Sequence, residues 1–463
     1  MAAALELAGI RKSFDGFLAL DDARFAAQWG EVHALLGENG AGKSSLMNIA
    51  AGLYAPEAGT MRVAGAAVRL GGPRDAAACG IGMVHQHFKL VRPFTVAENI
   101  LLASAPTASQ GGYRARLRAA DGAIRSRAAA LGFEIDPQRR IETLSIAERQ
   151  RVEILKVLLG GARILILDEP TAVLTDGEAE RLLQTVRALA REGAAVVLVT
   201  HKMADVQTYA DRVTVMRGGR TVDTLDPRST SAAELVRLTV GENVPAPRRS
   251  PGNRGAVRLR VRDLRTGDTG QRARLAGVSF DVHAGEIYGL AGVGGNGQSE
   301  LAGAIVGVAS GITGDIALDG ESGIAARAGR IAAIPADRHA YGLAGTLSIA
   351  ENYGLGAAPT GRYGPPWRLR RARMAEDAQA ATLAFNVQGV RSVRQRAALL
   401  SGGNAQKLVI AREFGKQPRL VLAHSPSRGL DVRASAEVHA RLLAARDAGA
   451  AVLLISEDLD EVL

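Results

Sequence analysis

Residues 37–45 have the types and spacing that bind phosphate. They match the pattern GxxxxGK[ST] and read Gly37, Glu38, Asn39, Gly40, Ala41, Gly42, Lys43, Ser44 and Ser45. The three glycines let successive backbone N–H groups point inward at a phosphate, an approach that a Cβ would obstruct. Lys43 is placed to reach the β- and γ-phosphates of a nucleotide, and the Ser44 hydroxyl to bind Mg²⁺. An apolar strand at 32–36 and a helix from Leu46 onward favour this interpretation over an accidental glycine turn.

Two neighbouring acids form the second candidate group. Asp168 and Glu169 follow an uninterrupted apolar run at 164–167, so we expect them at the end of a buried strand rather than at the start of a helix. Carboxylate oxygens suit a hard cation such as Mg²⁺, and a carboxylate beside a γ-phosphate can orient a water in line for attack. Gln86 and His201 also follow apolar runs. The acids therefore predict hydrolysis of the bound nucleotide.

Phe14 lies upstream of the phosphate loop. An aromatic ring at this place can stack on an adenine face, or it can be an ordinary core residue. The sequence leaves both interpretations open.

The composition is that of a globular chain with more than one domain: 463 residues, 47% hydrophobic and 22% charged. No apolar run approaches the ~20 residues that a membrane-spanning helix needs. The first residues lack the pattern of a signal peptide, so we expect the protein to stay in the cytosol. The single cysteine, Cys79, excludes an internal disulfide. The net charge of +10 suits nucleic acid or an acidic lipid surface, but the arginines are spread along the chain, which favours solvated faces.

The chain is predicted to be a tandem duplication of one α/β unit. An antiparallel strand pair is expected from Leu5 onward, helices at 94–132 and from Leu144, and a hairpin at 213–216 and 220–225. A linker rich in Pro, Arg and Gly spans 241–256, which divides the chain into domains 1–240 and 257–463. After the linker the pattern starts again. The second phosphate loop contains Gly292, Gly295, Gly297, Gln298 and Ser299.

The order of these motifs carries a family resemblance that spans nearly the whole chain. A phosphate loop, a Gln after a strand, a Leu-Ser-Gly-Gly type signature, Asp-Glu-Pro and a strand-end His resemble the ATP-binding subunits of ABC transporters. Two such halves in one chain resemble importers of monosaccharides and nucleosides, and segments 83–90 and 164–175 look more like the nucleoside branch. The resemblance implies two P-loop ATPase domains, each with a mainly parallel core sheet, an antiparallel N-terminal sub-sheet and a helical subdomain.

The resemblance also assigns roles in the first copy, with ATP and Mg²⁺ as cofactors. Asp168 helps to hold Mg²⁺ through water, Glu169 polarises the attacking water, Gln86 senses Mg²⁺ and the γ-phosphate, and His201 contacts the γ-phosphate. Glu169, His201 and Lys43 are thus the expected catalytic residues.

The second copy has lost this chemistry. Gln298 stands where the first copy has Lys43, His424 and Ser425 stand for the acid pair, and Glu457 stands for His201. A neutral amide supplies no point charge, imidazole is a poor Mg²⁺ ligand and a serine hydroxyl is a poor base at neutral pH. Glu457 would face phosphate with like charge. We expect hardly any ATP hydrolysis by this copy.

The signatures are distributed the other way. Residues 144–148 read Leu-Ser-Ile-Ala-Glu, and Glu148 would place a negative charge near phosphate. The second copy keeps Ser401, Gly402, Gly403 and Asn404, whose backbone N–H groups can meet a γ-phosphate. In the resembled family each ATP lies between the phosphate loop of one unit and the signature of the other. The intact parts of both copies then belong to one composite site.

The resemblance implies an ATPase subunit on the cytoplasmic face of the inner membrane, which docks on separate integral membrane permease subunits. An extracytoplasmic substrate-binding protein completes the expected assembly, and no nucleic-acid partner is expected. Alternatives are a ribose- or galactose-type monosaccharide importer and, from another class, a soluble tandem ATPase that acts on ribosomes or DNA. The short linker and the disabled second half argue against the latter.

The C-terminus departs from the repeat. Only six residues follow Glu457, so we expect the second copy to lack its closing hairpin, either naturally or because the sequence is truncated.

Overall fold

The structure is a computed structural model that describes residues 2–14, 16–86, 88–103, 112–172, 174, 176–241, 252–267, 275–292, 295–327, 329–357, 361–365, 367–416, 418–428 and 430–462. Two compact units divide the chain, Met1–Val244 and Pro245–Leu463. Most of the predicted linker at 241–256 lies outside the described residues.

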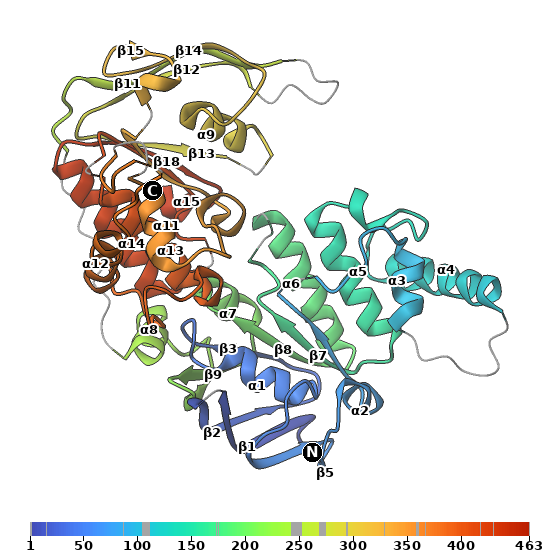
Figure 1. Cartoon of the computed structure of the whole chain (residues 1–463). Helices are drawn as coiled ribbons and strands as arrows, with labels where there is room; N and C mark the ends of the chain where they lie inside the picture. The colour runs from blue at the N-terminus through green and yellow to red at the C-terminus, as the bar shows by residue number, and fades with distance from the viewer. Residues whose placement is uncertain are drawn as a thin grey trace. The chain divides into compact units, whose positions relative to one another are not determined.

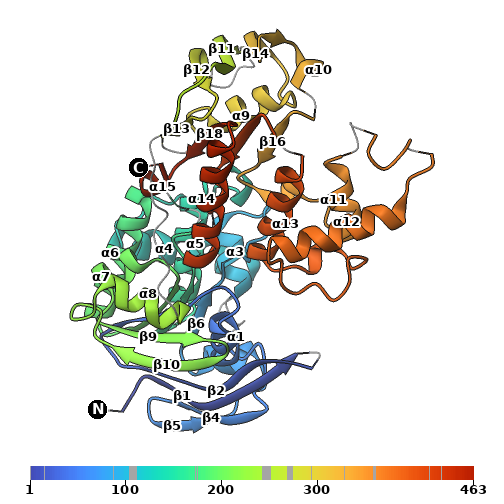
Figure 2. The same ribbon diagram turned by 90° about the vertical axis from the view of Figure 1, so that its left-hand side faces the viewer.

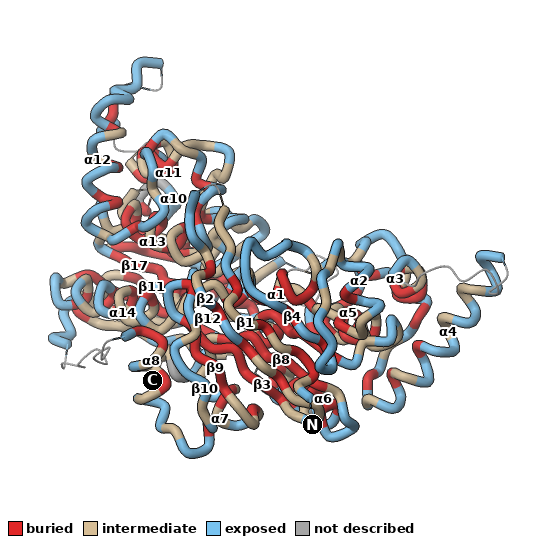
Figure 3. The backbone as a smooth tube through the Cα atoms, turned by 90° about the horizontal axis from the view of Figure 1, so that it is seen from below, coloured by how far each residue is buried: buried red, intermediate tan, exposed pale blue. Residues whose placement is uncertain are grey.

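Six strands form the main sheet of the first unit, in the order β10-β9-β3-β8-β7-β6 (Figure 1). They are β3 (Val32–Leu36), β6 (Ile81–Val84), β7 (Ile164–Asp168), β8 (Ala195–Thr200), β9 (Arg212–Arg217) and β10 (Arg220–Leu225). Neighbouring strands pair in parallel except β9 and β10, which form the predicted hairpin. Strands β3, β7 and β8 are buried along their whole length, because both faces of the sheet are covered (Figure 3).

A second, antiparallel sheet covers one face of the main sheet. Its strands are β1 (Leu5–Phe14), β2 (Phe17–Ala27), β4 (Ala58–Val63) and β5 (Ala66–Val68), in the order β2-β1-β4-β5. Alternate side chains of β7 enter two different cores. Ile164 and Ile166 pack in the core shared with this antiparallel sheet, whereas Leu165 and Leu167 pack in the core shared with helices. The predicted strand pair from Leu5 onward is confirmed.

Eight helices surround these sheets in the described part of the first unit. They are α1 (Lys43–Ala50), α2 (Pro73–Ala78), α3 (Val96–Ala103), α4 (Tyr113–Ala130), α5 (Ile146–Leu159), α6 (Asp176–Arg191), α7 (Met203–Tyr209) and α8 (Ala232–Val240). Helices α3, α4 and α5 form the helical subdomain at one end of the sheet (Figure 1). Ile100, Ile124 and Ile154 anchor these three helices to the core that also contains Leu165 of β7.

The second unit repeats this plan with a smaller main sheet. Strands β11 (Val257–Thr266), β12 (Ala276–His283), β14 (Ile312–Leu318) and β15 (Glu321–Ser322) form an antiparallel sheet in the order β12-β11-β14-β15. Strands β13 (Ile287–Ala291), β16 (Ile331–Ile334), β17 (Leu420–His424) and β18 (Ala451–Ser456) form a parallel sheet in the order β13-β18-β17-β16.

The helices of the second unit correspond to those of the first. They are α9 (Gln298–Val306), α10 (Ile324–Arg327), α11 (Ile349–Leu355), α12 (Arg371–Ala384), α13 (Gly402–Phe414), α14 (Val432–Asp447) and α15 (Leu459–Val462), and a π-helical turn at Arg338–Gly342 follows β16. Helices α11, α12 and α13 group together to one side of the parallel strands (Figure 2). After β18 the described chain continues only into α15, which contacts β13 and β18. None of the described helices in either unit is both long and apolar enough to cross a bilayer.

Candidate functional site

The phosphate loop of the first unit joins β3 to α1, as predicted. Gly37 and Gly42 have no room for a side chain: a Cβ on Gly37 would lie 2.4 Å from the Met216 carbonyl oxygen, and one on Gly42 would lie 2.7 Å from Cδ2 of Leu20. Gly42 also has a φ of 97°, in the left-handed region that favours glycine. The fold therefore requires two glycines of this loop on packing and backbone grounds alone.

The remaining loop residues differ in exposure. Ala41 is buried, Glu38 and Ser45 are half-buried, and Asn39, Gly40 and Ser44 are exposed. The exposed residues leave the loop open toward solvent on one side.

Lys43 extends its ammonium group into the loop. Its Nζ donates hydrogen bonds to the carbonyl oxygens of Gly37 at 2.7 Å and Glu38 at 3.0 Å, and the side chain is buried. A cation held by this loop sits where the bound phosphates of a nucleotide would place their negative charge.

Ser44 and Asp168 meet at the end of β7. The Ser44 hydroxyl donates to Oδ1 of Asp168 at 3.3 Å, although the two residues lie 124 positions apart in the chain. Asp168 is buried. A hydroxyl and a carboxylate are hard oxygen donors, so the pair fits Mg²⁺.

Glu169 is fixed from three sides. It has a φ of 48°, and its backbone N–H donates to the Val199 carbonyl oxygen of β8 at 2.9 Å. Gln86 Nε2 donates to its Oε2 at 2.8 Å, and His201 Nδ1 lies 3.1 Å from its Oε1. The side chains of Gln86 and His201, each predicted separately from the end of an apolar run, thus converge on the Glu169 carboxylate.

The charges around Glu169 keep it ionised. Burial raises its pKa, but the hydrogen bond and charge of His201, followed by the charges of Lys43 and Lys202, outweigh burial and lower the pKa below its usual value. An ionised carboxylate can accept a proton from water, as the expected general base must.

Phe14 ends β1 and is partly exposed. Its ring makes an edge-on contact with Tyr54 at a centroid distance of 5.1 Å, and the Lys12 ammonium lies 5.5 Å from its centroid. Sequence reasoning missed Tyr54, which has no distinctive spacing from the loop. This contact does not decide whether the Phe14 ring stacks on adenine, so the stacking stays a prediction.

In the second unit, the Gln298 side chain accepts a hydrogen bond from the backbone of its own loop. Oε1 of Gln298, which is buried, accepts a hydrogen bond from the Asn296 backbone N–H at 3.0 Å. Gly295 and Gly297 keep the positive φ angles of Gly40 and Gly42. Part of this loop, residues 293–294, lies outside the described residues. The backbone form of the loop is retained, while one N–H that could face phosphate is bonded internally.

The acid pair is replaced without a change of backbone. Ser425 has a φ of 44°, and its N–H donates to the Ile455 carbonyl oxygen at 2.7 Å, as Glu169 does to Val199. Burial, and then the Arg428 charge, lower the pKa of His424, which favours its neutral imidazole. Glu457 is exposed.

The two signature segments begin helices α5 and α13 differently. Ser145 accepts a hydrogen bond from the Glu148 backbone N–H, and the Glu148 carboxylate accepts one from the Ser145 N–H, so α5 starts with a capping box. Arg139 Nη1 donates to the same carboxylate at 2.6 Å. Glu148 therefore closes the start of its own helix and is ion-paired, a structural role that the sequence analysis did not assign to it.

Helix α13 starts without such a closure. Ser401 makes no side-chain cap, and its Oγ instead accepts from Asn404 Nδ2 at 2.9 Å. A Cβ on Gly402 would lie 2.6 Å from Nη2 of Arg338, a residue that sequence reasoning missed. An arginine beside an uncapped helix start gives an environment suited to an anion. Arg338 lies in the loop after β16, and this loop corresponds to the loop that contains Gln86 in the first unit. That correspondence could have identified Arg338 from the sequence.

Comparison with known proteins matches both units to one family model. The model described as "ABC transporter" matches residues 20–172 and 275–428. The chain is 40% identical to the nucleoside import ATP-binding protein NupA of Lactococcus lactis, covering 99% of this chain and 91% of that protein. It is 42% identical to the guanosine import ATP-binding protein NupO of Bacillus subtilis, covering 99% and 90%. It is 39% identical to the ribose import ATP-binding protein RbsA 1 of Streptomyces avermitilis, covering 99% and 87%.

Proposed function

The chain belongs to the ABC transporter family, and from this membership we propose that it is the ATP-hydrolysing subunit of an importer whose cargo is a nucleoside. The observation that carries the catalytic part is the carboxylate of Glu169, held between Gln86 and His201. The cargo rests on two relatives that carry nucleoside or guanosine in their names.

The first unit supplies the chemical groups. Lys43 and the loop amides bind the phosphates, and Glu169 takes a proton from the attacking water while His201 holds its carboxylate. Ser44, and Asp168 through water, would hold Mg²⁺, which would supply positive charge to offset the negative charge of the phosphates. Catalysis in this site is thus mostly positioning and electrostatic stabilisation.

The second unit supplies the clamp. We assign Ser401, Gly402, Gly403 and Asn404 to the γ-phosphate of the ATP that the first unit binds. Support comes from the two helix starts, because α5 is closed by Glu148 whereas α13 has no side-chain cap. The other composite site would combine Gln298, His424 and Ser425 with the closed start of α5, and would at most retain nucleotide.

The expected partners follow from the importer role. The chain would dock on the cytoplasmic face of integral membrane permease subunits, through the loop after Gln86 and the helices that follow it. An extracytoplasmic binding protein would deliver the cargo. A monosaccharide is the second candidate cargo, because the chain is 39% identical to a ribose import ATP-binding protein.

An ATPase assay on matched substitutions in the two loops and strand ends tests the site. Glu169→Gln should abolish turnover while ATP still binds, because the amide keeps the shape but cannot accept the proton. Gln298→Ala should cost little turnover. The reverse ranking would refute the assignment.

Uptake into proteoliposomes that contain the whole transporter tests the cargo. ATP is supplied on the side of the membrane where this chain lies. Labelled guanosine should then be transported, and unlabelled ribose should not reduce its uptake. If labelled ribose were taken up and labelled guanosine were not, the cargo would be a monosaccharide.

A further inference from the structure

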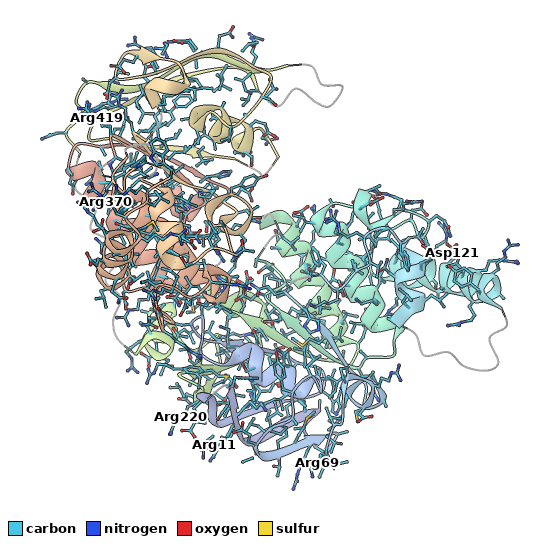
Figure 4. All side chains as sticks on the ribbon, in the orientation of Figure 1. Arg11, Arg69, Asp121, Arg220, Arg370 and Arg419 are labelled. Carbon is cyan, nitrogen blue, oxygen red and sulfur yellow. The ribbon has the colours of Figure 1, made fainter. Side chains whose placement is uncertain are left out.

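An exposed basic segment precedes and begins α12 in the second unit. Seven consecutive residues are exposed, Trp367, Arg368, Leu369, Arg370, Arg371, Ala372 and Arg373. Trp367 is 86% exposed and Leu369 45%. Arg370 lies at the margin of the unit in Figure 4. We refer to residues 367–373 as the arginine–tryptophan segment.

Hydrogen bonds anchor described residues on both sides of Trp367. Tyr363 is buried, its hydroxyl donates to Asp377 of α12 at 2.9 Å, and Arg362 pairs with the same carboxylate at 2.7 Å. The Arg370 N–H donates to the Tyr363 carbonyl oxygen at 2.8 Å. These bonds tie Arg362, Tyr363 and Arg370 to one another and to α12, and Trp367 lies between them in the sequence with its side chain exposed.

The positive charge of the segment is largely uncompensated. Within the described part of the chain, Arg368, Arg370 and Arg373 form no ion pair. Asp377 is already engaged by Arg362, and the carboxylate of Glu351 interacts with Arg371. Glu376, exposed on α12, adds one negative charge. Three arginines therefore remain available to an anionic partner, next to two apolar side chains.

The first unit has a similar group at the start of the corresponding helix, whereas Trp367 lies four residues before α12 begins. Helix α4, the counterpart of α12, begins with Tyr113, which is 57% exposed, and continues with the exposed Arg114 and Arg118. The catalytic groups differ between the two units, yet an exposed aromatic followed by arginines is present in both. This recurrence sets the segment apart from the arginines scattered over the rest of the chain.

We propose that the arginine–tryptophan segment binds an anionic phospholipid surface. The guanidinium groups would contact lipid phosphates, and Trp367 and Leu369 would enter the interface between headgroups and acyl chains. Exposed Trp and Arg also suit a single-stranded nucleic acid. Lipid is favoured because the chain belongs to a transporter family and because Leu369 adds an apolar contact that a nucleic-acid backbone would not use. The proposal goes beyond the importer function, since an ATPase subunit can dock on a permease without touching lipid.

Co-sedimentation with vesicles tests the charges. The purified full chain, without nucleotide or permease, is mixed with phosphatidylcholine vesicles that contain or lack phosphatidylglycerol. Replacing Arg368, Arg370 and Arg373 together by Gln should weaken partitioning to the anionic vesicles by about 100-fold, at roughly fivefold for each charge near such a surface. The matched control replaces Arg62, Arg69 and Arg74, which are exposed in the first unit, by Gln, and should bind nearly as the wild type does. Arg69 is labelled in Figure 4.

Tryptophan fluorescence tests the insertion of Trp367. The chain has two tryptophans, and Trp29 is partly buried with the Arg163 guanidinium 4.8 Å from its ring centroid. Anionic vesicles should shift the emission of the wild type to shorter wavelength, and Trp367→Phe should remove that shift. Replacing Arg368, Arg370 and Arg373 together by Lys should preserve binding to the anionic vesicles, because the positive charges are kept.

Three results would overturn the proposal. One is equal sedimentation of the wild type and the triple Gln variant, and another is an emission shift that persists in Trp367→Phe. The third is Trp367 quenching by a single-stranded oligonucleotide without any binding to anionic vesicles. Because the assay contains no ATP, a failed ATPase assignment leaves these results unaffected.

Discussion

The ends of β7 and β17 show the same backbone carrying different chemistry. Glu169 and Ser425 have φ angles of 48° and 44°, and each donates its N–H to a carbonyl oxygen of the neighbouring strand. A positive φ is uncommon for residues other than glycine. Because Ser425 keeps it without the carboxylate, the positive φ belongs to the fold, and the proposed catalytic role rests on the side chain of Glu169 alone.

The starts of α5 and α13 show the opposite distribution. The first unit closes its helix with Glu148, while the second leaves the helix without a side-chain cap and has Arg338 beside Gly402. Each unit thus keeps what the other has lost. The absence of acidic residues after β17 therefore does not by itself exclude the second unit from a role in ATP hydrolysis, because that unit retains the signature glycines.

Exchanging the residues after β7 and β17 should give the largest effect. Glu169→Ser should lower ATP turnover by roughly 10² to 10⁴, because the general base is lost while the backbone tolerates serine, as Ser425 shows. The reciprocal Ser425→Glu should restore nothing, since Gln298 and His424 remain. Steady-state ATPase rates check both. A gain of turnover in Ser425→Glu would show that the second unit is closer to competence than the comparison implies.

Substitution at the signature should give the next largest effect. Gly402→Ala should lower turnover by up to about 10², because a Cβ there would lie 2.6 Å from Arg338 Nη2 and would push that guanidinium away from the helix start that we assign to the γ-phosphate. Ile146→Ala, at the corresponding position of the first unit, is the matched control and should leave turnover near the wild-type rate. Equal losses in both would contradict the assignment of the clamp to the second unit.

The serines that begin the two helices should separate stability from activity. Ser145→Ala should destabilise the first unit by about 1 kcal/mol, since it removes the cap of α5, with little change of turnover. Ser401→Ala should cost less stability, because Ser401 caps nothing, but should slow turnover. Calorimetric unfolding and ATPase rates are the two measurements. A larger loss of stability in Ser401→Ala would mean that α13 is closed in a way that its hydrogen bonds do not show.

The smallest effect is a shift in pH dependence, measured on the residual turnover of a His201 variant. The hydrogen bond and charge of His201 are the leading causes that lower the pKa of Glu169 against its burial. His201→Ala should therefore raise that pKa and move the acid limb of the turnover profile to higher pH. The stabilisation from ionised Glu169, present above the unfolded-state pKa and lost as pH falls through the folded one, should shrink in the same variant. Lys202→Ala is the control, with a smaller shift in the same direction, and an unmoved acid limb in His201→Ala would contradict the coupling.

The sequence was sufficient for the core strands and the phosphate loop, because their signals are local, whereas β4, β5 and α2 were not predicted. The apolar run 164–167 predicted β7, and the glycine pattern of the phosphate loop predicted the turn between β3 and α1. The repeat predicted the second unit from the first. The assignments of individual site residues stay predictions, although the structure brings Gln86, Glu169 and His201 together.

Contacts between distant residues could not be predicted. Gln86 and Glu169 are 83 positions apart, and nothing in either segment specifies that amide and carboxylate meet. The inward fold of Gln298 onto Asn296 depends on rotamers that a pattern does not encode. Glu148 is different, because a Ser followed three residues later by Glu is a capping-box signal. The spacing of Ser145 and Glu148 could therefore have predicted the cap, whereas the sequence analysis considered only the charge of Glu148.

The capping box of α5 also bears on which halves can work together. Two copies of the first unit, facing each other, would present each phosphate loop with a helix start whose N–H groups and carboxylate already satisfy one another. In the proposed arrangement, such a like-with-like pair would present the Glu148 carboxylate to the phosphates. If each ATP lies between a phosphate loop and a helix start, as we propose, Glu148 would disfavour a pair of first units and favour a pair of unlike units.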